Sequence, residues 1–131
     1  MDVERTLGPP HRKIHDELLS YSFPGMEVYF SFSSNPNCQQ KLPYTSWNVT
    51  SDTVTGIRIT IRPGPRVADT GIDLTKYKKI EVGGDLLDHY AYLNADNSFV
   101  IMVGNDYLVG YQYQPGTKHE NLRCEAINRK E

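Results

Sequence analysis

The sequence predicts an α+β domain built mainly from antiparallel β-sheet, with one short helix at the N-terminus. Residues 26–33 alternate between apolar and polar side chains, which is typical of a half-buried strand. Residues 98–103 and 107–113 are also strand-like, and the Gly104-Asn105-Asp106 sequence between them favours a tight hairpin turn. Helical periodicity is confined to a few short segments. Together these observations favour a sheet-dominated fold.

The first elements along the chain are the helix and a hairpin. Residues 2–7 are predicted to be helical, and the Gly-Pro-Pro sequence that follows ends the helix. Residues 11–16 are polar and are predicted to form a loop. Residues 18–23 are predicted to be a strand that joins the strand at 26–33 through the Pro24-Gly25 turn.

A long polar excursion then separates the hairpin from the third strand. Residues 34–52 are rich in Ser, Asn, Pro and Gln, and an excursion of this length needs a tether or a function. Cys38 and the Trp47 side chain are the predicted tethers. Residues 53–62 form the third strand, with a bulge expected at Gly56 because the apolar phase slips there.

The second half is predicted to repeat the order of the first, a short helical turn followed by antiparallel strands. It contains helical turns at 73–77 and 118–123 and strands at 78–82, 86–93, 98–103 and 107–113. We predict a single domain over residues 1–131, with halves 1–64 and 65–131 that suggest a distant internal duplication. The tail from Glu125 is polar and is expected to fray.

The two cysteines, Cys38 and Cys124, carry the main prediction about compartment. They lie far apart and form neither a Cys-x-x-Cys motif nor a Cys/His cluster, so one long-range disulfide is the favoured interpretation. The alternative is two buried free thiols in a reducing compartment. A disulfide would place the protein in the periplasm, in the envelope or outside the cell. We then expect a leader to have preceded Met1 in the precursor.

Composition excludes several classes of function. The chain has 131 residues, 38% hydrophobic residues and a net charge of −2, so nothing favours nucleic acid or an anionic membrane as a partner. No segment approaches the length of a transmembrane helix. Nine tyrosines accompany one tryptophan and four phenylalanines, an excess that suits both half-exposed strands and binding surfaces.

Several segments resemble known protein families. The segment DVERTLGPP, followed by a Tyr-rich hairpin, is similar to the start of small outer-membrane lipoproteins of the BamE (SmpA/OmlA) type. The segments WNVTSDTVTGIRITIRP, DLTKYKKIE and YLVGYQYQPGTKHENLRC resemble, in the same order, small secreted proteins of uncharacterised function from Acidobacteria and related soil bacteria.

The second resemblance covers nearly the whole chain. It implies that Cys38 and Cys124 are paired and that the mature protein is exported, and it implies no activity. At the level of fold alone, the two halves also resemble the helix-plus-sheet repeats of the β-lactamase inhibitor protein.

The histidines are weak candidates for chemistry. His11 and His15 have the spacing of a helical zinc site, but no helix long enough is predicted there, so solvated loop histidines are favoured. His89 could act as a general base with Asp85 or Asp88, yet adjacent strand residues point to opposite faces. We predict no catalytic residue, no metal ligand and no cofactor.

The tyrosines are the main candidates for a binding surface. Tyr90 and Tyr92 are predicted to share a face of one strand, and Tyr107, Tyr111 and Tyr113 a face of another. If these faces coincide, they form an aromatic strip for a glycan, a peptide or a protein; the alternative is that they form the core. Trp47 is either a core plug for its loop or a binding residue.

The predicted function is therefore that of a non-catalytic exported binding or structural module of the bacterial envelope or extracellular space. Its partner would be a protein or glycan of the envelope, or a second copy paired through sheet edges. The alternatives are a proteinaceous inhibitor of a secreted hydrolase that uses loop 34–52, a self-assembling surface protein, and a small His/Asp enzyme.

Overall fold

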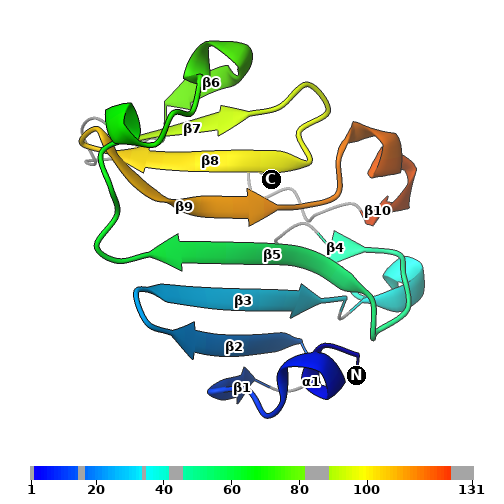
Figure 1. The fold of residues 1–131 in the computed structure, drawn as a ribbon. Helices are drawn as coiled ribbons and strands as arrows, with labels where there is room; N and C mark the ends of the chain where they lie inside the picture. Colours follow the sequence, from blue (N-terminus) through cyan, green and yellow to red (C-terminus); the bar gives the residue numbers. More distant parts are fainter. Residues whose placement is uncertain (1, 15–16, 34, 42–45, 82–88, 125–131) are drawn as a thin grey trace.

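A computed structural model of the chain describes residues 2–14, 17–33, 35–41, 46–81 and 89–124. One eight-stranded antiparallel sheet dominates it, with the strand order β1-β2-β3-β5-β9-β8-β7-β6 (Figure 1). Its strands are β1 (Arg12–Ile14), β2 (Leu18–Phe23), β3 (Met26–Phe32), β5 (Val54–Ile61), β6 (Lys78–Glu81), β7 (His89–Leu93), β8 (Phe99–Gly104) and β9 (Tyr107–Tyr113). The predicted antiparallel sheet is confirmed.

The remaining elements are short. A second, two-stranded sheet pairs β4 (Ser46–Trp47) with β10 (Arg123–Cys124). The helical elements are α1 (Asp2–Leu7), η1 (Pro36–Cys38), η2 (Val67–Asp69), η3 (Leu74–Lys76) and η4 (Thr117–Leu122). Because strands dominate the described residues and α1 is their one α-helix, predominantly β is a closer description than α+β.

The sequence-based prediction of a loop at residues 11–16 is wrong in part. Arg12, Lys13 and Ile14 form β1, which pairs antiparallel with β2 at the edge of the sheet. All three residues of β1 are exposed, so the strand has no apolar alternation that could reveal it. Residues 86–88 of the predicted strand 86–93 and the tail 125–131 lie outside the described residues.

Two register shifts shape the sheet. Ser31 pairs with Gly56 and Phe32 with Val54, which leaves Thr55 as an extra residue beside the predicted position of the bulge. A second shift was not predicted. Met102 pairs with Gly110 and Val103 with Leu108, which leaves Val109 as the extra residue of β9. Each bulge reverses the alternation of faces for the residues beyond it.

The first half of the sheet packs one face against α1. The buried side chains of Leu19, Tyr21 and Phe32 form its core, and Val3 of the helix packs on them. The Tyr21 hydroxyl donates a hydrogen bond to the carbonyl oxygen of Gly8, at 3.0 Å, where the helix has ended. A six-residue helix has little stability of its own, so this packing holds it in place.

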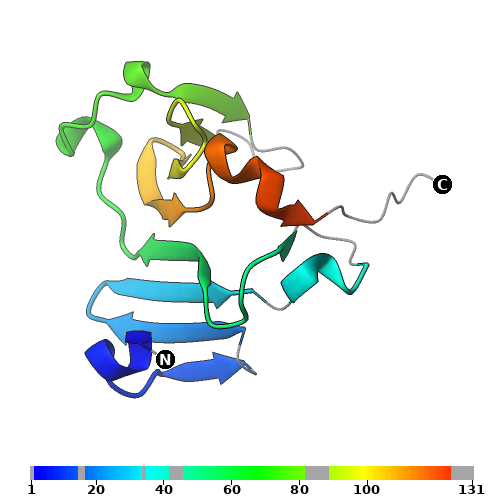
Figure 2. The same cartoon turned by 90° about the vertical axis from the view of Figure 1, so that its right-hand side faces the viewer.

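The second half of the sheet has a larger core. Ile101, Val103 and Leu108 are its buried centre. Four side chains of the segment that carries η2 and η3 pack on this centre: Val67, Ile72, Leu74 and Tyr77. Figure 2 shows this segment and α1 on the same side of the sheet. Both halves therefore bury the same face of one continuous sheet, joined where β5 pairs with β9.

Candidate functional site

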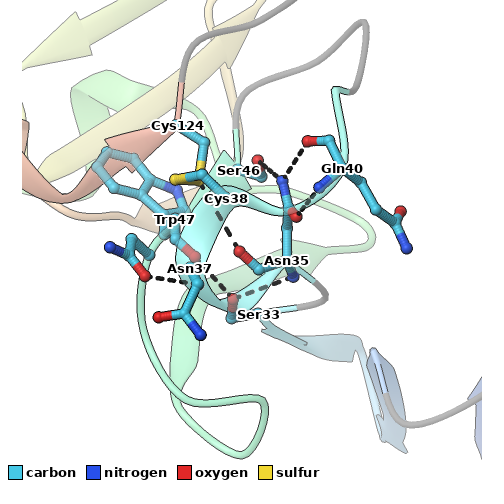
Figure 3. The surroundings of a disulfide bond; sticks show 9 residues. Ser33, Asn35, Asn37, Cys38, Gln40, Ser46, Trp47 and Cys124 are labelled. Carbon is cyan, nitrogen blue, oxygen red and sulfur yellow. Dashed lines mark hydrogen bonds between the residues drawn. A yellow bond between two sulfur atoms is a disulfide. The ribbon is translucent and has the colours of Figure 1, made fainter.

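The disulfide between Cys38 and Cys124 is present, which confirms the predicted pairing. The two Cα atoms lie 5.4 Å apart, and 86 positions separate the cysteines in the sequence. The bond joins η1, after the first hairpin, to β10 near the end of the described chain (Figure 3). It thereby ties the end of the described chain to the segment that follows β3, at one end of the large sheet (Figure 1).

Asn35 fixes the chain next to the disulfide. Its side chain is 1% exposed, and its Nδ2 donates hydrogen bonds to the carbonyl oxygen of Gln40 at 2.9 Å and to Ser46 Oγ at 3.0 Å. Its Oδ1 accepts the Gln40 backbone N–H at 2.8 Å (Figure 3). Because every polar group of this buried amide has a partner, it holds the described parts of loop 34–52 in one arrangement.

Trp47 is held by the C-terminal segment. It pairs with Arg123 in the small sheet, and the guanidinium carbon of Arg123 lies 5.5 Å from the centre of the indole ring. Arg123 Nε also lies 3.1 Å from Glu120 Oε1 in η4. The neighbouring Asn48 backbone N–H donates to the carbonyl oxygen of Leu122 at 2.7 Å. These contacts fix the tryptophan next to η4.

A hollow of about 530 Å³ lies between Trp47, the start of β5, the end of β9 and η4. We call it the end hollow, because it lies where β5 begins and β9 finishes. Its apolar lining is Trp47, Val49, Val54, Ile57, Tyr113, Pro115 and Leu122, and its polar lining is Thr53, Thr55, Asp96, Ser98, Gln114, Lys118 and His119, with Gly56 and Gly116 between them. An indole and a phenol ring thus share one cavity with hydroxyl, amide and charged groups.

Asp96 and Gly116 build the polar side of the end hollow. Asp96 Oδ1 accepts hydrogen bonds from Ser98 Oγ at 2.6 Å and from the Ser98 backbone N–H at 3.1 Å. These bonds, helped by the positive charge of Lys118, lower the pKa of Asp96. The Thr117 N–H donates to the Asp96 carbonyl oxygen at 2.7 Å. A Cβ on Gly116 would lie 2.7 Å from that oxygen, so only glycine fits there.

The register brings four of the five candidate tyrosines to one face of the sheet. Tyr92 and Tyr111 both pair with Ile101, and Tyr90 and Tyr113 follow the same alternation on their own strands. Tyr92 and Tyr111 pack in the core of the second half. Tyr90 lies beside Tyr92 with a ring separation of 6.5 Å, and Lys79 Nζ lies 3.9 Å from its ring centre.

Tyr107 does not share this face, contrary to the sequence-based prediction. The extra residue Val109 reverses the alternation, so Tyr107 pairs with Gly104 on the other face. Tyr107 is 44% exposed, and Arg66 lies 5.7 Å from its ring centre. Of the candidate tyrosines, only Tyr113, which is 47% exposed, lines the end hollow with Trp47.

The histidines occupy separate places. His11 is exposed ahead of β1, and His89 lies half-buried in β7, against Gly104. His15, Asp85 and Asp88 lie outside the described residues, so the structure does not test their predicted pairings. Among the residues described, no three His, Cys, Asp or Glu side chains come together as a metal site. His119, an exposed residue of η4, lines the end hollow.

Both edge strands of the large sheet carry charged residues. β1 contains Arg12 and Lys13, and β6 contains Lys78, Lys79 and Glu81. Charged edges of this kind oppose pairing between sheets. None of the helices in the described part of the chain is long and apolar enough to span a membrane.

Sequence reasoning named Trp47 and Tyr113 together as candidate binding residues, on a surface formed by the tyrosine-bearing sheet and the loop around Trp47, and both line the end hollow. It missed Asp96, Gln114 and Lys118, because these residues lie in turns that become neighbours only through the fold. Searches of protein-family models, of curated proteins and of solved structures find no match to this chain.

Proposed function

We propose that this protein is an exported, non-catalytic binding domain that takes its ligand in the end hollow. The proposal of export rests on the disulfide, because disulfides persist in oxidising compartments such as the periplasm and the extracellular space. The resemblance to secreted bacterial proteins points the same way. The bacterial envelope or the space outside the cell is therefore the proposed location, and a glycan or protein found there is the proposed partner.

One observation carries the binding proposal: Trp47 and Tyr113 wall a hollow of about 530 Å³ that also contains polar side chains. Small-molecule sites have volumes of roughly 300–1,000 Å³ and combine a mainly apolar lining with a few polar groups. Partly exposed aromatic rings are the side chains most often used as anchors in such sites. The end hollow has this composition, and it lies on a frame fixed by a disulfide.

The polar groups of the hollow support binding more than catalysis. The Ser98 hydroxyl and N–H are both directed to Asp96, so this pair is used to shape the turn before β8. Nucleophilic catalysis by cysteine would need a free thiol. Both cysteines are engaged in the disulfide and do not supply such a thiol.

A fragment screen read by NMR at the single Trp47 indole N–H tests the proposal. We expect some small polar aromatic or polyhydroxylated compounds to shift the Trp47 signal and the Tyr113 ring signals together. The shifts should be lost in Tyr113→Ala and kept in Tyr107→Ala, a matched control because both tyrosines are similarly exposed and only Tyr113 lines the hollow. A screen with no such hits, or with hits that Tyr113→Ala leaves intact, would overturn the proposal.

A further inference from the structure

We infer that the end hollow binds a neutral saccharide, with one sugar ring placed against Trp47 and Tyr113. This inference rests on the proposed function, because it names the chemical class of ligand for the same site. Three properties of the lining support it: the aromatic rings, the kinds of polar group and the balance of charge.

The aromatic rings provide flat apolar surfaces. Tyr113 is 47% exposed, and its ring centre lies 4.9 Å from that of Phe99, which packs on the core of the second half. Trp47 is fixed by Arg123 and the small sheet. Both rings are therefore held in place before a ligand arrives, which reduces the entropy lost on binding. A pyranose ring offers a matching flat face of C–H groups.

The polar groups suit a ligand that has many hydroxyls. The lining includes Asp96, Gln114, Thr53 and Thr55, whose side chains carry both acceptors and donors. Gln114 is itself oriented, because its Nε2 donates to the Asn97 carbonyl oxygen at 2.7 Å and its Oε1 accepts from Gln112 at 3.0 Å. Sugar hydroxyls donate and accept at the same atom, so such a mixed lining can satisfy them.

The charge of the lining favours a neutral ligand. The lining contains one acidic residue, Asp96, and one lysine, Lys118, and their charges are opposite. His119 is the remaining titratable side chain of the lining apart from Tyr113. A site for an anion would concentrate basic groups and a site for a cation acidic groups, whereas here one group of each sign shares the cavity. A neutral ligand meets no net repulsion.

The test is a titration of the full chain with disaccharides, read by Trp47 fluorescence and by NMR. The neutral probes are the β-1,4-linked and α-1,4-linked disaccharides of glucose and the β-1,4-linked disaccharide of N-acetylglucosamine. Uronic-acid and amino-sugar disaccharides of the same size serve as charged comparisons. We expect at least one neutral probe to bind more tightly than every charged one. Tyr113→Ala should weaken that binding about 10-fold, because one stacked ring contributes on the order of 1.4 kcal/mol.

Two variants separate loss of the ring from loss of the fold. Tyr113→Phe keeps the ring and should keep the binding within about 3-fold of wild type. Tyr107→Ala removes an equally exposed ring outside the hollow and should leave the binding unchanged. Binding that survives Tyr113→Ala, or that is tighter for a charged disaccharide, would overturn the inference.

The two proposals fail in distinguishable ways. If no disaccharide binds at millimolar concentration but the fragment screen gives hits that depend on Tyr113, the saccharide inference is wrong and the binding site stands. If neither disaccharides nor fragments perturb Trp47, both proposals are wrong.

Discussion

The core of the second half and the end hollow lie on the same face of the sheet but differ in what covers that face. Over Tyr92 and Tyr111 the cover is the segment with η2 and η3, which contributes four apolar side chains to the core. Around Tyr113 the neighbouring segments are β4, through Trp47, and η4, through Lys118, His119 and Leu122, and a hollow remains between them. The same residue type on the same face therefore becomes core in one place and cavity wall in the other.

This difference teaches that the covering segment, and not the strand pattern, decides what an aromatic residue does here. Tyr111 and Tyr113 are two residues apart on β9, and Phe99 contacts both, with ring separations of 5.7 Å and 4.9 Å. Of the two, only Tyr113 lines the end hollow.

The disulfide should have the largest effect. The double variant Cys38→Ser/Cys124→Ser should lose about 4–5 kcal/mol of the free energy of unfolding, because the bond closes a loop of 86 positions in the unfolded chain. Urea denaturation measures the loss. The control is wild type with excess reductant, which should approach the double variant. An unchanged denaturation midpoint would show that the small sheet and the Asn35 contacts hold the cover without the bond.

The disulfide can also be tested by measuring the intact mass of the protein after treatment with an alkylating reagent. Protein purified from an oxidising compartment and denatured without reductant should take up no alkylating reagent, whereas reduced protein should take up two equivalents, one for each cysteine. Alkylation of unreduced protein would contradict the proposed exported location.

The two neighbouring tyrosines should respond differently to truncation. Tyr111→Ala should cost about 3 kcal/mol of unfolding free energy, since it removes a ring from the core. Tyr113→Ala should cost less than about 1 kcal/mol, because nearly half of that side chain is already exposed. Thermal or urea denaturation of the two variants measures both. Equal losses would mean that Tyr113 belongs to the core and that the distinction drawn here fails.

Two glycines test the sheet beneath both regions, where β5 pairs with β9. A Cβ on Gly110 would lie 2.0 Å from the carbonyl oxygen of Ile59, so Gly110→Ala should push the strands apart and cost about 1–3 kcal/mol. Gly56→Ala is the matched control on β5, because its Cβ would make only ordinary contacts, the nearest at 3.7 Å. Unfolding free energies from urea denaturation should separate the two; similar values would contradict the close approach.

Lowering the pH should have the smallest of these effects on the free energy of unfolding. The pKa of Asp96 is lower in the folded protein than in the unfolded chain, so its carboxylate stabilises the fold above the unfolded pKa. That contribution should disappear as pH falls through the lowered folded pKa. Asp96→Asn removes it, so the difference in stability between wild type and variant should shrink from pH 6 towards pH 2. A difference that is constant over this range would exclude the carboxylate as its source.

The sequence predicts the strands well because their apolar residues alternate. It places the helix, the main strands of both halves and the disulfide, and it locates one bulge within a residue. It fails where the pattern carries no apolar signal, as in the exposed strand β1, and where an extra residue reverses a face, as Val109 does for Tyr107.

The end hollow could not be predicted for a different reason. Its walls come from residues around positions 47–57, 96–98 and 113–122, and they meet only when β4 pairs with β10. Polar turn residues such as Asp96 and Gln114 show no local pattern that distinguishes a cavity wall from a solvated loop. The burial of Asn35 could not be predicted from the sequence either, because its hydrogen-bond partners Gln40 and Ser46 become its neighbours only when the loop folds.

The most direct test of the account is a crystal structure of the protein soaked with small organic probes and a neutral disaccharide. The account predicts that they gather between Trp47 and Tyr113 in the end hollow and leave the covered core around Tyr92 and Tyr111 unoccupied. Probes that avoid the end hollow and collect on another surface, such as the edge strand β6, would contradict it.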